Sequence, residues 1–163
     1  MPTKVHLKVA DEVWIAAAQL HKAQPSAVDF SIAEIVAAAN RMEDSDPPRP
    51  GVYVHVIQHC VANRPPNPGR YRMLYETADG RRRLFRKSDP FHPDRAESKI
   101  TPRRDDIPAE YYQLLDWYAD WCEVTARTNV VDDPLLKLSG SGKTIWADES
   151  ADEYVERLRE GWQ

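Results

Sequence analysis

Three patterns in this sequence have residue types and spacings that could do chemistry. Gly142, Lys143 and Thr144 match the end of a phosphate-binding loop, in which backbone amides and a lysine hold nucleotide phosphates. The first glycine of that motif would fall at position 137, which is Lys137, and only 19 residues follow Thr144. The pattern is therefore too incomplete to predict a nucleotide-binding core.

His55 and His59 form the second pattern, with the spacing of two zinc ligands on one helix face, but the glutamate of a zinc protease motif is missing. Cys60 could be a third ligand only if it left the apolar side of its helix. The carboxylates at positions 116, 120 and 123 repeat at helical turns without a partnering histidine, which is typical of a solvated face. We therefore predict no catalytic residue, no metal and no cofactor.

The third pattern is a concentration of basic residues. Although the formal net charge is −4, residues 1–104 carry 17 basic and 12 acidic side chains, whereas residues 105–163 carry 5 and 14. Residues 64–104 alone hold 12 basic and 5 acidic side chains. This division favours a polyanion-binding segment joined to an acidic one, and the alternative is a chance run of solvated arginines on an exposed hairpin.

The elements that must position these residues begin with two helices. Residues 10–22 place apolar side chains at spacings of three and four, and the acidic residues of the first turn suit the positive end of a helix. Ser31 and Glu34 form a capping-box pattern, which predicts a second helix over about 32–41.

A third helix is predicted over about 50–62. At 100° per residue, its inner arc contains Tyr53, Val54, Val56, Ile57, Cys60 and Val61. Its outer arc contains Gly51, His55, Gln58, His59 and Ala62. The outer arc has no carboxylate, as a helix that enters a DNA groove requires, although an ordinary solvent face would look the same.

A hairpin follows, with strands near 71–75 and 82–86 joined by a turn that contains Asp79 and Gly80. Its basic residues are Arg70, Arg72, Arg81, Arg82, Arg83, Arg86 and Lys87. Residues 88–106 are polar and interrupted by prolines, which predicts a loop.

Three helices followed by a basic hairpin are the order of a winged helix-turn-helix, so we predict an α+β, mainly helical fold of this kind. The candidates for base or groove contacts are Arg49, His55, Gln58 and His59. The basic residues of the hairpin would contact phosphates.

The run from His55 to Asn67, HVIQHCVANRPPN, is followed by Tyr71 and the arginine-flanked hairpin. Over roughly residues 8–87 this sequence resembles a winged-helix family of mostly uncharacterised bacterial and archaeal proteins, some of them associated with restriction or defence. The resemblance implies the fold and DNA binding, and it implies no enzyme activity.

The rest of the chain divides by pattern into further parts. Residues 1–104 would be the winged-helix domain, 105–124 an additional packing helix, 125–149 a linker, and 150–163 a C-terminal amphipathic helix. The last helix is acidic and has an apolar stripe, so it could dock on a partner protein or fold back onto its own domain.

The C-terminal sequences DPLL (133–136), GSGK (140–143), IWADE (145–149) and DEYVERLREGW (152–162) are similar to the arms of small antitoxins that neutralise PIN-domain ribonuclease toxins. By that resemblance, the apolar anchors in the toxin groove would be Trp146, Tyr154, Leu158 and Trp162. Arg157 or Arg159 would reach the acidic metal site of the toxin.

Composition bounds the remaining possibilities. No stretch approaches the roughly 18 apolar residues of a membrane span, and the N-terminus lacks the apolar core of a signal peptide. Two cysteines exclude a disulfide scaffold or a four-cysteine zinc site. We therefore predict a cytoplasmic protein.

The favoured hypothesis is a protein that binds double-stranded DNA, carries an acidic C-terminal interaction arm, and serves as a transcriptional regulator or antitoxin-like module. The alternative is a protein-interaction adaptor in a restriction or defence system, with no direct contact to nucleic acid. A PIN-type toxin or a defence protein would be the partner of the arm. Two-fold DNA binding would also require a homodimer, for which the sequence shows no heptad seam.

Overall fold

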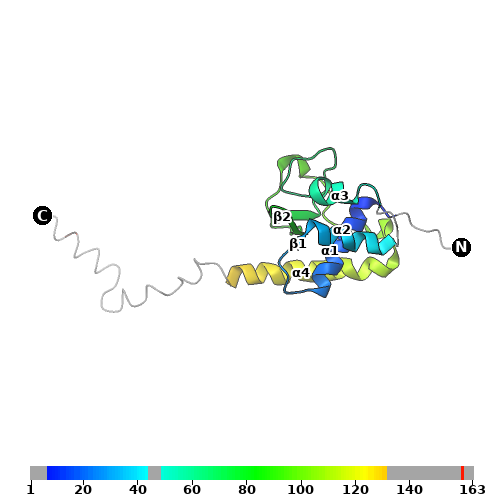
Figure 1. The fold of residues 1–163 in the computed structure, drawn as a ribbon. Coiled ribbons are helices and arrows are strands. Elements are labelled where there is room, and N and C mark those ends of the chain that lie inside the picture. Colours follow the sequence, from blue (N-terminus) through cyan, green and yellow to red (C-terminus); the bar gives the residue numbers. More distant parts are fainter. Residues whose placement is uncertain (1–6, 44–48, 132–158, 160–163) are drawn as a thin grey trace. The chain divides into compact units, whose positions relative to one another are not determined.

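The computed structural model describes residues 7–43, 49–131 and 159 (Figure 1). Within these residues the order of elements is α1 (Val9–Ala23), β1 (Phe30–Ser31), α2 (Ile32–Glu43), α3 (Val52–Val54), β2 (Leu74–Ala78), β3 (Arg81–Leu84) and α4 (Tyr112–Val131). The strands form one small antiparallel sheet. The prediction of an α+β protein is confirmed, with about half of the described residues in helices. The chain divides into two compact units, residues 1–122 and 123–163, and each is described by itself. No helix in the described ranges combines the length and apolar character needed to cross a membrane.

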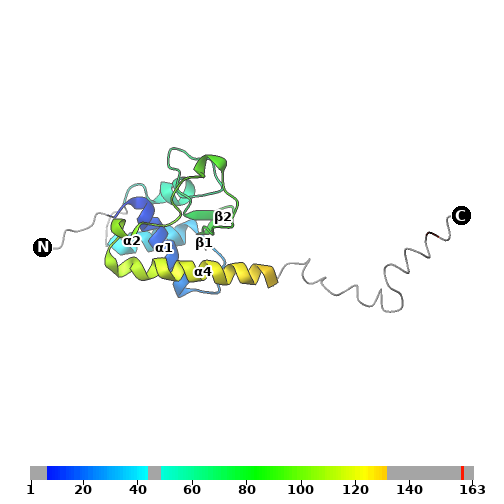
Figure 2. The same ribbon diagram turned by 180° about the vertical axis from the view of Figure 1, so that it is seen from behind.

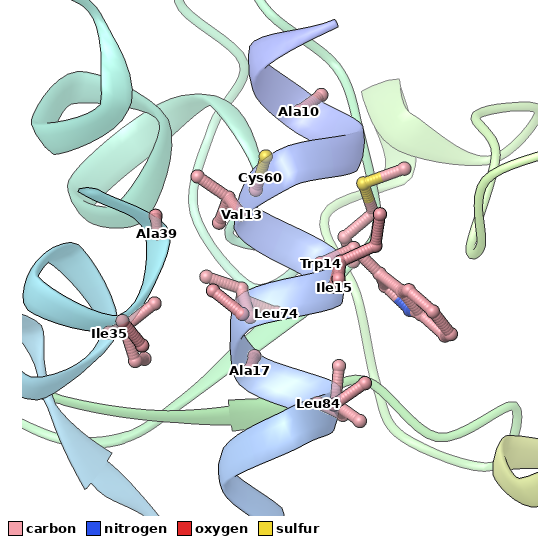
Figure 3. Packing of buried hydrophobic residues seen from close by; sticks show 14 of the residues in the cluster. Ala10, Val13, Trp14, Ile15, Ala17, Ile35, Ala39, Cys60, Leu74 and Leu84 are labelled. Carbon is pink, nitrogen blue, oxygen red and sulfur yellow. The ribbon is translucent and has the colours of Figure 1, made fainter. Parts of the chain in front are cut away.

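Helix α1 (Val9–Ala23) lies at the centre of the core. Every residue from Ala10 to Ala18 is buried, so the helix is covered on all sides and not only along its predicted apolar stripe. Figure 3 shows Ile35 of α2 and the hairpin residues Leu74 and Leu84 around it. The helix contains several alanines, whose small side chains let neighbouring elements approach its axis.

The two acidic residues in the first turn of α1 are fully buried. The Nζ of Lys99 donates a hydrogen bond to Oδ1 of Asp11 at 2.6 Å, and Nη1 of Arg49 donates to Oε2 of Glu12 at 2.8 Å. These carboxylates therefore bind two distant segments of the chain to α1, in addition to lying at the positive end of the helix.

Helix α2 (Ile32–Glu43) begins with the predicted capping box. The amide of Ser31 donates to Oε2 of Glu34 at 2.8 Å, and the amide of Glu34 donates to Oγ of Ser31 at 3.2 Å. These two hydrogen bonds confirm the predicted start of the helix. The start could be predicted because the interaction involves only residues that are three positions apart.

The hairpin consists of β2 (Leu74–Ala78) and β3 (Arg81–Leu84), and Gly80 in the turn has a φ of 71°. This confirms the predicted hairpin, although β2 begins three residues later than expected and β3 begins one residue and ends two residues earlier. The short strand β1 (Phe30–Ser31) pairs with the other edge of β3, so the sheet order is β1-β3-β2. Leu74 and Leu84 lie opposite each other and are both buried.

The third helix differs from its prediction in length and winding. Helix α3 (Val52–Val54) continues directly into a π-helix, His55–His59. A π-turn contains more residues than an α-turn, so faces assigned at 100° per residue shift. Tyr53 and Val54, predicted to face inward, are 58% and 40% exposed, whereas Ala62, predicted to face outward, is buried.

The segment 88–106 is largely irregular, as predicted, with short 3₁₀ turns at Pro93–Arg95 and Arg104–Asp106. It contains the fully buried Arg95, which sequence analysis did not single out. Every one of the five guanidinium N–H donors of this residue has a backbone carbonyl partner. The acceptors lie at 2.7–3.3 Å and belong to Gln58, His59, Arg64, Pro65 and Tyr71.

Arg95 therefore closes the C-terminal end of the π-helix, where carbonyl groups have no intrahelical partner. Burial lowers the pKa of its guanidinium. None of its hydrogen-bond acceptors is a carboxylate, so a buried positive charge is held by backbone dipoles alone.

Helix α4 (Tyr112–Val131) follows a 3₁₀ turn at Ala109–Tyr111. The predicted solvated face is confirmed, because the acidic positions 116, 120 and 123 are exposed, while Leu114 and Tyr118 on the other side of the helix are buried. The rings of Trp14 and Tyr118 meet edge to face at 5.6 Å, and Figure 2 shows the beginning of α4 beside α1.

The linker predicted from residue 125 begins too early, since α4 continues to Val131. Residues 125–131 contain neither glycine nor proline, and the first proline after them is Pro134, so nothing in the sequence stops the helix sooner. The remainder of the predicted linker lies outside the described residues. The predicted helix at 150–163 also lies outside them, apart from residue 159.

Candidate interaction surface

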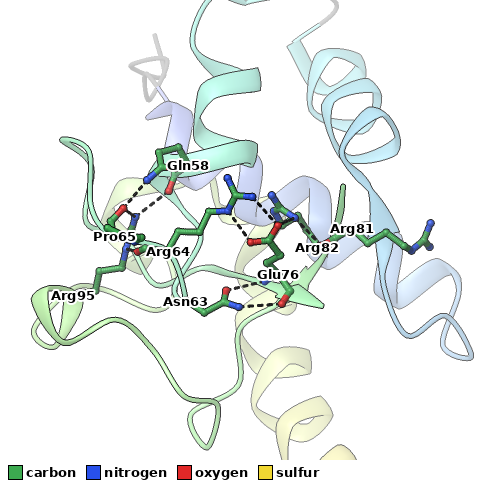
Figure 4. Close-up of polar contacts among 8 residues, drawn as sticks. All are labelled: Gln58, Asn63, Arg64, Pro65, Glu76, Arg81, Arg82 and Arg95. Carbon is green, nitrogen blue, oxygen red and sulfur yellow. Dashed lines mark hydrogen bonds and ion pairs between the residues drawn. The ribbon is translucent and has the colours of Figure 1, made fainter. Parts of the chain in front are cut away.

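The arginine at the centre of β3 is not on the surface. Arg82 is only 1% exposed, and its Nη1 lies 3.0 Å from Oε1 of Glu76 on β2. Arg64 donates two hydrogen bonds of 2.7 Å to the same carboxylate (Figure 4). Hydrogen bonds from Arg64 hold the pKa of Glu76 below its usual range, and Arg82 adds to this effect. Glu76 thus forms ion pairs with two arginines, and these three side chains together keep a net positive charge.

The arginines on either side of Arg82 are paired in the same way. Nε of Arg81 lies 2.5 Å from Oδ1 of Asp29, a carboxylate in the connection before β1. Arg83 is buried and donates two hydrogen bonds to Asp89, at 2.6 and 2.7 Å. The expected row of three free arginines on this strand is therefore absent from the described hairpin, because carboxylates from three different segments surround it.

Arg72 and Arg86, which flank the strands, contact aromatic rings. The guanidinium of Arg72 lies 4.4 Å from the ring centroid of Phe91 and also donates to the carbonyl of Ser98. The guanidinium of Arg86 lies 4.8 Å from the ring centroid of Trp121. These contacts fix the hairpin to the following loop and to α4, so both arginines have structural roles.

Arg70 and Lys87 remain as exposed cations of the predicted phosphate-binding set. Within the described part of the chain, neither side chain takes part in an ion pair. They precede β2 and follow β3, so they lie outside the paired strands of the hairpin.

The predicted base-contacting residues are half-buried and make contacts within the protein. His55 has Nδ1 2.8 Å from the carbonyl oxygen of Gly51, and burial lowers its pKa. The side-chain amide of Gln58 donates to the carbonyl of Pro65, and His59 lies against Gly69. Arg49 binds Glu12, as described above. The structure places these four residues near α3, but it does not direct them together toward solvent.

The two histidines lie close together, with ring centroids 4.8 Å apart. Cys60 beside them is fully buried, and burial raises the pKa of its thiol. Over the described ranges, no group of three or more potential metal-ligating side chains is found.

An open, mainly apolar groove with a volume of about 520 Å³ lies between α2 and α3. Its lining consists of Ile32, Ala33, Val36, Ala37, Asn40 and Tyr53. Tyr53, at the edge of the groove, has one of the most exposed large apolar side chains of the described residues. Asn40 is the one lining residue with an amide side chain, and no lining residue is charged.

Sequence analysis did not identify this groove, because it assigned Tyr53 to the buried arc of a regular helix. One sequence feature could have indicated the groove: the outer face of the second helix is small and apolar, with Ala33 and Ala37 at exposed positions. Both helices are needed to form the groove, and their mutual placement is a tertiary property.

Most of the predicted partner-binding arm falls outside the described residues, namely Trp146, Tyr154, Arg157, Leu158 and Trp162. Arg159 is described as helical and exposed. The comparisons add no further assignment: no protein-family model, no curated protein and no solved structure matches this chain.

Proposed function

We propose that this protein is a protein-interaction adaptor that binds a partner in the groove between α2 and α3. The groove itself carries the proposal, because it combines an uncharged, mainly apolar lining with a tyrosine that is 58% exposed. Tyrosine and aliphatic side chains that become buried together are typical of the energetically important centre of a protein interface.

Charge supports the same proposal over DNA binding. Affinity for a duplex comes largely from cations that replace the counterions of phosphates. In this protein Arg81 and Arg83 each have a carboxylate partner, and Arg82 shares Glu76 with Arg64, so these arginines are engaged within the protein before any ligand arrives. A change of all three arginines to glutamate would disrupt folding, and it is therefore unsuitable as a test of DNA binding.

The proposed scaffold is a winged helix. The supporting observations are the order α1, β1, α2, α3, β2, β3 and a sheet in which β1 pairs with the returning strand of the hairpin. Folds of this kind serve both DNA and protein recognition, so the scaffold alone does not decide the function.

Site-specific cross-linking in living cells tests the adaptor. A photoreactive benzophenone amino acid in place of Tyr53 samples the groove, and the same amino acid in place of Val28 is the control. Val28 is 69% exposed in the connection between α1 and β1, away from the groove lining. We expect a protein adduct at position 53 only, sensitive to protease and resistant to nuclease. Equal adducts at both positions, or nuclease-sensitive adducts, would refute the proposal.

DNA binding is the second candidate, and one observation favours it. Residues 49–75 include four arginines and no carboxylate, and Arg70 and Lys87 are exposed cations beside the hairpin that take part in no ion pair with the described residues. If these residues contact phosphates, the double change R70E/K87E reduces the slope of log affinity against log salt by about 1.8, at roughly 0.9 per contact.

The matched control for that experiment is K22E/R103E, which changes the net charge equally at two exposed cations elsewhere. Fluorescence anisotropy with a labelled duplex measures both variants. An equal effect of the two double changes would indicate nonspecific attraction and would remove this candidate.

We propose the acidic C-terminal arm as a second partner-binding segment, with a PIN-type ribonuclease or a defence protein as its partner. This part of the proposal is supported by the sequence resemblance of the arm. Titration of such a purified ribonuclease with the full chain, and with its W162A variant, tests it. Inhibition by both proteins at equal concentrations would refute the role of the arm.

A further inference from the structure

The outer face of α2 carries one acidic and one basic side chain beside the groove. Glu34, Ala37 and Arg41 are all exposed and lie on one line along the helix, because they are three and four residues apart. The two charged residues are seven positions apart, which is about 10 Å at a rise of roughly 1.5 Å per residue. The groove borders this line, since Ala37 also belongs to its lining.

We infer that the groove binds a second copy of this chain, through antiparallel packing of α2 against α2 of the other copy. This inference rests on the proposed function and names the partner of the same groove. The two helices cross at Ala37, about a two-fold axis perpendicular to both. That operation places the same surface of each copy against itself, as an isologous interface requires.

Charge complementarity selects this occupant and this orientation. With the crossing at Ala37, Glu34 of one copy lies beside Arg41 of the other, and the symmetry repeats the pair. A parallel arrangement would instead bring like charges together. The capping hydrogen bonds of Glu34 use Oε2, which leaves Oε1 for the arginine of the second copy.

The remaining side of the interface is apolar. The two-fold axis keeps the groove side of one copy against the groove side of the other, so each Tyr53 meets the groove of its neighbour. Ala33 and Ala37 have the smallest side chains that a helix carries without losing propensity, and they allow the axes to approach to roughly 8 Å.

Sedimentation equilibrium of the full chain tests the inference, with an expected mass of twice 18.7 kDa. A37E places a charge at the crossing and should give monomers, while V28E, at an exposed site away from the groove lining, should remain dimeric. R41E should weaken association about tenfold, because two ion pairs become two like-charge pairs. The exchange E34R/R41E should restore it. Circular dichroism shows whether each variant keeps its helices.

The outcomes separate the two proposals. A monomer at every concentration overturns the second-copy inference, and so does a dissociation constant that is unchanged in A37E and R41E. If the chain is monomeric but the benzophenone at position 53 captures another protein, the adaptor stands and only the identity of its partner is wrong. If neither dimer nor adduct forms, both proposals fail.

Discussion

Acidification should destabilise this protein through His21, a buried histidine near the end of α1. The amide of Leu84 donates to Nε2 of His21 at 3.4 Å, and the ring of Phe30 lies 4.8 Å away. Burial, together with the positive charges of Arg86 and Arg83, lowers the pKa of His21 to about 4. The side chain is therefore neutral in the folded protein at neutral pH.

The size of the effect follows from the difference between folded and unfolded pKa values. The unfolded pKa is 6.5, and a decrease to about 4 corresponds to about 3 kcal/mol once the pH lies below both values. At pH values between about 4 and 6.5, the unfolded chain binds more protons at His21 than the folded protein does. The free energy of unfolding therefore decreases as the pH falls through this range. At about pH 5 the loss is about 2 kcal/mol relative to about pH 8.

Urea unfolding of the full chain at these two pH values measures the loss, and H21Q isolates the histidine. Glutamine retains an acceptor for the Leu84 amide but does not titrate. The variant should therefore lack about 2 kcal/mol of the decrease seen in the wild-type protein. The comparison of the two proteins also cancels the contribution of His55, whose pKa is lowered as well.

H92Q is the matched control, because His92 is a half-buried histidine in the loop after the hairpin and has no role in the core. The free energy of unfolding of H92Q should decrease between the two pH values as much as that of the wild-type protein. The reasoning about His21 would be refuted if H21Q lost as much stability as the wild type between the two pH values.

Three further substitutions test the internal contacts, each by the midpoint of thermal or urea unfolding. R95K removes at least two of five buried donors and should cost about 2–5 kcal/mol, whereas a cost below about 0.5 kcal/mol would show that water can replace them. E76Q leaves the buried Arg82 without its carboxylate and should cost about 3–5 kcal/mol, and R82M combined with E76Q should recover part of it. G69A places a Cβ 2.6 Å from Cβ of His59, so it should cost about 1–3 kcal/mol, and a neutral result would mean that the loop moves freely.

Features that depend on neighbouring residues could be predicted from the sequence. The capping box of α2 needs only Ser31 and Glu34, and the hairpin needs only an Asp-Gly turn between two strand-forming runs. The solvated carboxylate face of α4 could also be predicted, because its period is that of a regular α-helix.

The partners of the basic residues could not be predicted in this way. Arg81 binds Asp29, which is 52 residues earlier in the chain, and Arg83 binds Asp89 in a loop. A count of charges treats each arginine as free, whereas tertiary structure decides which carboxylate it meets. The exposure of Tyr53 could not be predicted either. No local sequence pattern indicated the π-helix, which changes the number of residues per turn.

The hydrogen bonds of Arg95 also determine when the middle of the protein can finish folding. The acceptors lie between residues 58 and 71, but their donor is made 24 to 37 residues later. During synthesis, the carbonyl groups at the end of the third helix depend on water for these hydrogen bonds until that arginine leaves the ribosome. A shortened chain that stops after the hairpin would keep every residue of α1, α2 and α3 and still lack the side chain that completes them.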